Sequence, residues 1–166
     1  MPRRKSRKSA SKCGRIKHIK TTINGITFDS KLEADYYSYL LQLKANKIVK
    51  DIELQPEYIL QDKFIIYDGQ TIFGDDIKFN SLKRKYKLPT IQAIKYIADF
   101  KVTYLDGHIE VIDTKTLISN TPEFKLKKKL LLCKYPTIDF KVITKYKDEW
   151  ILLDDYAKIL RNKKKK

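Results

Sequence analysis

Asp113-Thr114-Lys115 is the part of the sequence whose residue types and spacing best fit a chemical role. In an extended strand, residues two positions apart point to the same side, so the Asp113 carboxylate and the Lys115 ammonium would face one substrate. Carboxylates bind hard divalent cations, and such a cation activates water and neutralises charge on a phosphate during phosphodiester hydrolysis. The spacing therefore predicts part of a metal-dependent hydrolytic site.

A second acid, Asp99, must reach the same point, and the turn between the two strands decides whether it does. A three-residue loop at 105–107, with Gly107 in the left-handed conformation, places Asp99 directly across from Asp113. A two-residue loop at Asp106-Gly107 would place Asp99 across from Thr114 instead. We favour the three-residue loop, which brings the two carboxylates close together. Two carboxylates at that separation repel unless a cation or a proton lies between them.

Several motifs occur in the order and spacing of a known nuclease pattern. They are Phe28-Asp29-Ser30-Lys31-Leu32-Glu33-Ala34, Leu54-Gln55-Pro56, Tyr96-Ile97-Ala98-Asp99-Phe100 and Asp113-Thr114-Lys115. The last two resemble the PD-(D/E)XK nuclease superfamily. Together the motifs are similar to a phage and prophage family of that superfamily, close to Holliday-junction resolvases and phage endonuclease I. The resemblance covers most of residues 20–146.

The resemblance implies a restriction-endonuclease-like core and a defined set of site residues. These residues are Glu33, Asp99, Asp113 and Lys115, with the backbone carbonyl of Thr114 as a further metal ligand. The two aspartates and Glu33 would bind Mg²⁺ or Mn²⁺, and Lys115 would position the attacking water. Two positions depart from the pattern: Asp113 stands where many relatives carry Glu, and Thr116 stands where Gly is expected. The shorter Asp keeps the ligand but would shift the metal slightly.

The same residues also have structural explanations. Ser30 and Glu33 form a capping box, in which Glu33 bonds back to the cap of the helix. A second interpretation of Asp113 and Lys115 is that they lie on the solvated edge of a hairpin. Their apolar neighbours instead predict a strand that is covered on both faces, where unpaired charges are costly. His108 has no partner at ligand spacing, and we assign it no role.

The helix after the motif carries a run of lysines, among them Lys125 and Lys128. Such a run is either a solvated face or a set of phosphate contacts. The packed side of this helix is predicted to contain Phe124, Leu126, Leu130 and Leu131.

The net charge of +16 is concentrated at the two ends of the chain. Residues 1–20 contain nine Lys or Arg and no acid, and residues 161–166 contain five more, which leaves the body nearly neutral. Such segments remain disordered and bind phosphates through counterion release, although they also serve as solubilising tails. The predicted DNA-contacting residues are Arg3, Arg4, Lys5, Arg7, Lys8, Lys125 and Lys128.

The order of elements predicts one mixed α/β domain whose central mixed sheet is flanked by helices. We expect a hairpin at Asn24-Gly25, helices at 29–46, 121–133 and 153–160, and strands at 48–60 (interrupted at Pro56), 94–104, 108–116 and 138–146. Residues 62–90 are the least regular and are expected to be an insertion or flap. The nuclease domain would span residues 20–160, between a basic arm at 1–19 and a basic tail at 161–166.

These observations predict a metal-dependent, structure-selective DNA endonuclease, most specifically a Holliday-junction resolvase. The resemblance implies a homodimer acting on branched or four-way DNA, with no small-molecule cofactor. The alternatives are a nicking or restriction-like nuclease, or a non-catalytic DNA-binding accessory protein on a nuclease-like scaffold. Two distant cysteines and the lack of a long apolar stretch predict a cytoplasmic protein without a membrane partner.

Overall fold

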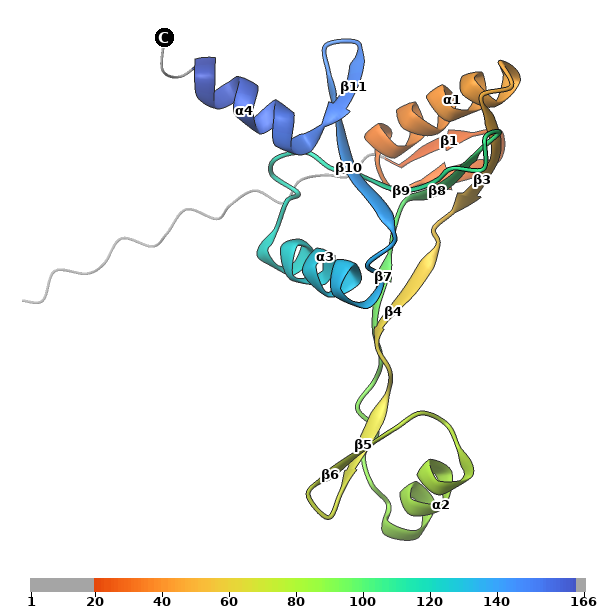
Figure 1. The fold of residues 1–166 in the computed structure, drawn as a ribbon, viewed down its shortest axis with the longest axis vertical. Helices are drawn as coiled ribbons and strands as arrows, with labels where there is room; N and C mark the ends of the chain where they lie inside the picture. Colours follow the sequence, from red (N-terminus) through yellow and green to blue (C-terminus); the bar gives the residue numbers. More distant parts are fainter. Residues whose placement is uncertain (1–19, 164–166) are drawn as a thin grey trace, which may run out of the picture.

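A five-stranded mixed sheet forms the centre of the molecule (Figure 1). The computed structural model describes residues 20–163. The strands lie in the order β11-β10-β9-β8-β3. Their bounds are β3 (Val49–Leu54), β8 (Phe100–Tyr104), β9 (Ile109–Thr114), β10 (Asp139–Tyr146) and β11 (Glu149–Leu152). Neighbouring strands are antiparallel except β9 and β10, which run parallel.

Helices cover both faces of this sheet. They are α1 (Lys31–Ala45), accompanied by the hairpin of β1 (Thr21–Ile23) and β2 (Ile26–Phe28), and, on the other face, α3 (Pro122–Lys134) and α4 (Leu153–Lys163). Leu40 of α1 belongs to one core with Ile112. Phe124 of α3 and Leu153 of α4 belong to the other core, with Val111. The side chains of adjacent residues of β9 therefore pack into the cores on opposite faces of the sheet. The predicted α/β class, with a mixed sheet flanked by helices, is confirmed.

Local signals at the element ends act as the sequence predicts. The Ser30 hydroxyl accepts the backbone N–H of Glu33 at 3.1 Å and caps α1. Thr121 caps α3 in the same way, through the N–H of Phe124 at 3.2 Å. Asn24-Gly25 forms the two-residue loop between β1 and β2.

The turn between β8 and β9 is the three-residue loop that we favoured. Tyr104 donates its backbone N–H to the carbonyl of His108 at 2.8 Å, and Gly107 has a φ of 89°. Phe100, the first residue of β8, pairs with Ile112. Asp99 and Asp113 follow this last pair, but Asp99 lies outside β8 and the paired register ends at Phe100 and Ile112.

The strand predicted at 94–104 is not continuous. It is split at Ala98-Asp99 into β7 (Ile94–Ile97) and β8, and the strand predicted at 48–60 is split at Gln55-Pro56 into β3 and β4 (Glu57–Gln61). The two breaks lie side by side, because Gln55 N–H donates to the Asp99 carbonyl at 3.0 Å and Ala98 N–H donates to the Pro56 carbonyl at 3.1 Å. Pro56 has no N–H for a regular ladder. Beyond the breaks, β4 and β7 pair as a separate ribbon.

Residues 62–90 are more regular than expected. The β4–β7 ribbon leads to a hairpin of β5 (Phe64–Tyr67) and β6 (Gln70–Phe73), followed by α2 (Ile77–Tyr86). Ile65 and Phe79 are buried within this part of the chain. Strands β4 and β7 still pack against α3, through Leu60 and Tyr96. Residues 64–93, which we call the lobe, lie beyond them and project away from the sheet and its helices (Figure 1).

The C-terminal tail predicted at 161–166 is partly helical, because α4 continues to Lys163. The basic arm at 1–19 and residues 164–166 lie outside the described residues. The predictions for Arg3, Arg4, Lys5, Arg7 and Lys8, which belong to this arm, therefore also lie outside them. Within residues 20–163, every helix is too short or too polar to span a bilayer.

Candidate active site

Asp113 and Lys115 face the same side of the sheet at the end of β9, as the strand alternation predicts. The Asp113 side chain is 1% exposed. One of its oxygens accepts a hydrogen bond from the Lys115 ammonium, and the other accepts one from the hydroxyl of Tyr96 on β7. A buried carboxylate needs such partners, because leaving water without them costs several kcal/mol.

Lys115 is held as a cation. Burial alone would lower the pKa of Lys115, but the charges of Asp113 and Asp99 outweigh burial and raise it. Its ammonium also lies 5.3 Å from the centre of the Phe124 ring on α3. A protonated Lys115 cannot act as a base, but it can orient a water molecule or stabilise negative charge on a phosphate.

Asp99 is held at the break between β7 and β8 by a single neighbour on β9. One carboxylate oxygen accepts both the backbone N–H of Thr114 at 2.7 Å and its hydroxyl at 2.8 Å. Burial raises the pKa of Asp99 to about 6, with a further contribution from the charge of Asp113, and Lys115 opposes this shift. Asp99 is therefore electrostatically coupled to both residues of the Asp-x-Lys motif.

Glu33 joins this group from the first turn of α1. The Ser30 hydroxyl accepts the backbone N–H of Glu33 and donates to its carboxylate at 2.7 Å. The Glu33 carboxylate therefore bonds to the hydroxyl of the cap residue and not, as the capping box predicted, to its backbone amide. Burial raises the pKa of Glu33, and the charge of Asp99 raises it further. Lys115 is also near enough to act on it, in the opposite direction. Glu33 is thus bonded to the N-cap residue of α1 and electrostatically coupled to the site at the same time.

The four residues open onto two neighbouring cavities rather than one. Glu33 and Asp99 line a cavity of about 120 Å³ together with Gln55, on the side of α1. Asp113 and Lys115 line a cavity of about 350 Å³ beside α3. The expected convergence of Asp99 and Asp113 side chains on one point is therefore not observed. The break at Ala98-Asp99 releases Asp99 from the strand alternation, and its carboxylate turns to Thr114.

The types of the donor groups suit a hard divalent cation, although the described residues do not bring ligand oxygens of Glu33, Asp99 and Asp113 together at one point. The Lys115 ammonium is bonded to Asp113, and the charges of Asp99 and Glu33 also act on its pKa. Burial and mutual repulsion raise the pKa values of Glu33 and Asp99. A cation relieves such a surplus of negative charge. Carboxylate oxygens suit Mg²⁺ and Mn²⁺, and Mg²⁺ keeps several waters rather than demanding a closed protein cage. The carbonyl of Thr114 as a further ligand stays a prediction.

Comparison with known proteins identifies a family. Residues 14–149, which include all four candidate residues, match the family described as protein of unknown function DUF1064. The chain belongs to the DUF1064 family. No curated protein and no solved structure matches it. The similarity of this DUF1064 chain to PD-(D/E)XK nucleases therefore stays a prediction.

Tyr96 is a member of the site that sequence reasoning did not single out. Burial raises its pKa, and the neighbouring charge of Asp113 raises it further, so the hydroxyl remains protonated and donates to that carboxylate. The signal was present in the sequence, because the Tyr-x-Ala-Asp-Phe motif that contains Asp99 begins with Tyr96.

Of the α3 lysines of the DUF1064 chain, Lys127 lines the larger cavity, whereas Lys125 and Lys128 are not among its lining residues. The packed side of α3 also differs from the prediction. Lys125 is exposed, and Lys128 lies 5.9 Å from the centre of the Phe140 ring. Phe124 and Leu131 are buried as expected. Leu126 and Leu130, expected on the packed side, are 59% and 37% exposed, so this expectation was wrong.

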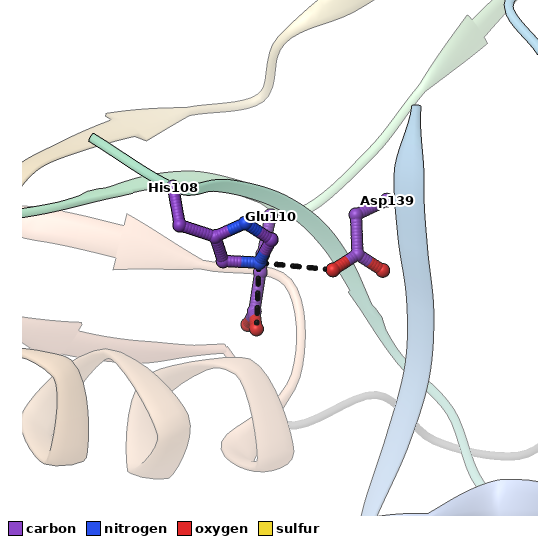
Figure 2. A group of neighbouring side chains, drawn as sticks. All are labelled: His108, Glu110 and Asp139. Carbon is purple, nitrogen blue, oxygen red and sulfur yellow. Dashed lines mark ion pairs between the residues drawn. The ribbon is translucent and has the colours of Figure 1, made fainter. Parts of the chain in front are cut away.

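A second group of ionisable residues lies toward the other end of β9. Figure 2 shows His108 pointing toward Glu110 and Asp139, with its Nε2 at 3.4 and 3.0 Å from their carboxylate oxygens. The expectation that His108 has no partner at ligand spacing was wrong, because the parallel strand β10 brings Asp139 beside it. Lys141 bonds to Glu110 and lies 3.5 Å from Asp139, and the Tyr104 hydroxyl donates to Glu110 at 2.8 Å. These bonds explain the group as a compensated cluster of ion pairs.

Proposed function

We propose that the DUF1064 chain is a metal-dependent DNA endonuclease whose active site comprises Glu33, Asp99, Asp113 and Lys115. The observation that carries the proposal is the position of Asp113 and Lys115. They lie bonded to each other on one face of β9, with Asp99 and Glu33 close enough to perturb the same charges. Stability alone gives no reason to keep a buried ion pair, because apolar residues of similar volume are often at least as stable.

Each side chain has a task in phosphodiester hydrolysis. The carboxylates of Asp99, Asp113 and Glu33 would hold Mg²⁺ or Mn²⁺, which when bound supplies Lewis acidity and an activated water. Lys115 stays protonated and would orient the attacking water or stabilise charge on the phosphate. Tyr96 and Thr114 hold Asp113 and Asp99 in place.

Within this proposal the substrate is branched DNA, most specifically a four-way junction, and the active form is a homodimer. A four-way junction is resolved by cuts in two strands, so two active sites are required. The net charge of +16 supports a nucleic-acid partner through phosphate attraction, which by itself carries no sequence preference.

Two other functions are compatible with the same fold. A nicking or restriction-like nuclease would use the same residues on unbranched duplex. A non-catalytic DNA-binding accessory protein would use the basic tails alone and would not need Lys115.

One assay separates these functions. Wild-type protein and Lys115→Ala are incubated with linear duplex, flap and four-way junction DNA, with and without Mg²⁺. We expect the wild type to cut the junction only with Mg²⁺, and Lys115→Ala to be slower by roughly 100-fold or more while still binding DNA. Cutting of linear duplex with equal efficiency would replace the junction substrate by a restriction-like one. The absence of Mg²⁺-dependent cutting of every substrate would refute the nuclease proposal.

A further inference from the structure

Helix α2 of the lobe carries cations that the fold does not use. Residues 77–87 contain no acidic residue and five basic ones, all of them exposed: Lys78, Lys83, Arg84, Lys85 and Lys87. Among residues 20–163, no carboxylate forms an ion pair with any of these five. The nearest acids in the chain are occupied elsewhere, because Asp75 pairs with Lys63 at 2.5 Å and Asp76 caps the helix.

This concentration of charge is unfavourable for the isolated lobe. Positions three and four apart on a helix are neighbours, so Lys83 and Lys87 repel each other. The helix dipole favours cations in the last turn, but its partial charge of about one half is smaller than the charge present there. An external anion would compensate the remainder.

The position of α2 limits where that anion lies. The lobe projects from the sheet, and its chain returns directly to Asp99 (Figure 1). Ten residues lead from Lys87 to Ile97. At roughly 3.3 Å per residue they span at most about 33 Å, which is close to the roughly 34 Å of one turn of duplex DNA.

We propose that α2 binds the phosphate backbone of DNA within about one helical turn of the candidate active site. The choice of DNA rests on the proposed function. A phosphate backbone fits α2 because it offers regularly spaced negative charge to exposed side chains that form no ion pair within residues 20–163. Of these side chains, Lys85 also lies 5.1 Å from the centre of the Tyr86 ring. The lobe would then give the enzyme a second contact on its substrate, distinct from the cavities beside Asp99 and Asp113.

The lobe also exposes apolar side chains, including Ile66, Phe73 and Ile77, which are 54%, 53% and 90% exposed. A second copy of the chain is therefore the rival occupant. Two copies meeting at α2 would bring two unpaired basic clusters together, which makes this the weaker candidate.

The test compares two double variants of the full chain that remove equal charge. Lys83→Gln/Arg84→Gln changes α2, and Lys47→Gln/Lys50→Gln changes two exposed cations before and within β3. Binding to a labelled duplex and to a labelled four-way junction is measured by fluorescence anisotropy, without divalent cations, over a series of KCl concentrations. Lys83→Arg/Arg84→Lys tests whether positive charge alone suffices.

We expect the α2 double variant to reduce the slope of log K against log salt by about 1.8, since each neutralised phosphate contributes about 0.9. The β3 variant should leave the slope unchanged, and the charge-retaining variant should bind like the wild type. Equal slopes for the α2 and β3 variants, or loss of binding in the charge-retaining variant, would overturn the inference. So would a change in sedimentation coefficient of the α2 variant without a change in slope, which would assign the lobe to a second copy.

Cutting by the wild type with Mg²⁺ is measured in parallel. A reduced slope without cutting would leave the lobe as a DNA contact and remove the nuclease proposal. Cutting by the wild type together with an unchanged salt slope for the α2 variant would support the nuclease proposal and overturn the proposed DNA contact of the lobe.

Discussion

At the scale of residues, Asp113 is the side chain whose burial most needs an explanation. It lies almost without solvent exposure between Lys115 and Tyr96. The hydrogen bonds from Lys115 and Tyr96 offset the free-energy cost of removing the Asp113 charge from water, but such bonds seldom exceed that cost. Asp99 and Glu33 add two more partly buried carboxylates, whose ionisation is made harder by their surroundings. A protein selected for stability alone has no use for this surplus of charge, whereas a cation-binding site requires it.

Asp99→Asn should therefore stabilise the protein in the absence of divalent cations. The pKa of Asp99 is raised from 3.8 to about 6, so the folded state holds the proton more tightly than the unfolded state. This contribution to stability is complete below about pH 4 and is lost as the pH rises through about 6. We expect the free energy of unfolding by urea to rise by about 1–3 kcal/mol at about pH 7.5, with little change near pH 4.

The matched control is Asp148→Asn, a change of an exposed acid between β10 and β11, which should alter neither value. An Asp99→Asn protein that is less stable than the wild type at about pH 7.5 would show that the Thr114 contacts, rather than charge repulsion, dominate at this position.

At the scale of elements, the β8–β9 turn fixes which residues of the two strands lie opposite each other. Gly107 adopts a φ of 89° in the three-residue loop, and the resulting register pairs Phe100 with Ile112, the residues next to Asp99 and Asp113. Without this loop, the strand ends that carry the two aspartates would be offset. The turn lies at the far end of both strands from the site, so it acts through register rather than through contact.

Gly107→Val should destabilise the fold and reduce cutting together. A β-branched residue at positive φ costs about 1–3 kcal/mol. Gly107→Asn, which tolerates the left-handed conformation, should keep both stability and activity near those of the wild type. Thermal unfolding and junction cleavage of the two variants provide the measurement. A fully active Gly107→Val protein with unchanged stability would show that the turn does not control the site.

The register and the helix caps could be predicted because their signals are local. Gly107, Ser30 and Thr121 each act within a few residues of their position, so the sequence alone decides the outcome. The break at Ala98-Asp99 could not be read in the same way, because the run from Tyr96 to Phe100 is apolar enough to look continuous. Its cause lies on another strand, at Pro56, and becomes visible only when β3 and β4 are placed beside β8 and β7.

The same limit applies to the orientation of side chains in the site. The prediction that Asp113 and Lys115 share a face followed from strand alternation and is confirmed by their ion pair. The direction of the Asp99 carboxylate depends on the break, and the partners of His108 depend on the parallel pairing of β9 with β10. The elements within residues 62–90 were missed because a short hairpin and a polar helix give weak periodic signals.

At the scale of the whole molecule, positive charge is concentrated at the two ends of the sequence, on either side of a nearly neutral stretch. The sequence places fourteen Lys or Arg and no acid within residues 1–20 and 161–166. The described chain adds a further basic group on α2, at the end of the projecting lobe. The nucleic-acid partner that we propose carries the extended negative charge that such groups attract.

Removal of residues 1–19 should weaken DNA binding without abolishing cutting. This deletion removes eight Lys or Arg, including Arg3, Arg4, Lys5, Arg7 and Lys8, but none of the candidate catalytic residues. We expect a weaker Kd and a flatter dependence of binding on salt, with Mg²⁺-dependent cleavage retained at saturating protein. Loss of cleavage at saturation would place part of the chemistry in the deleted segment.

The most direct test of the account is the cleavage rate of Asp113→Asn on a four-way junction with Mg²⁺, compared with wild type and with Glu53→Gln. The first change removes one charge from the buried end of β9, and the second removes one from an exposed position on β3. Circular dichroism establishes that both variants are folded. We predict that Asp113→Asn lowers the rate by roughly 100-fold or more with DNA binding preserved, while Glu53→Gln cuts at the wild-type rate. Cutting by Asp113→Asn at a rate near that of Glu53→Gln would contradict the account.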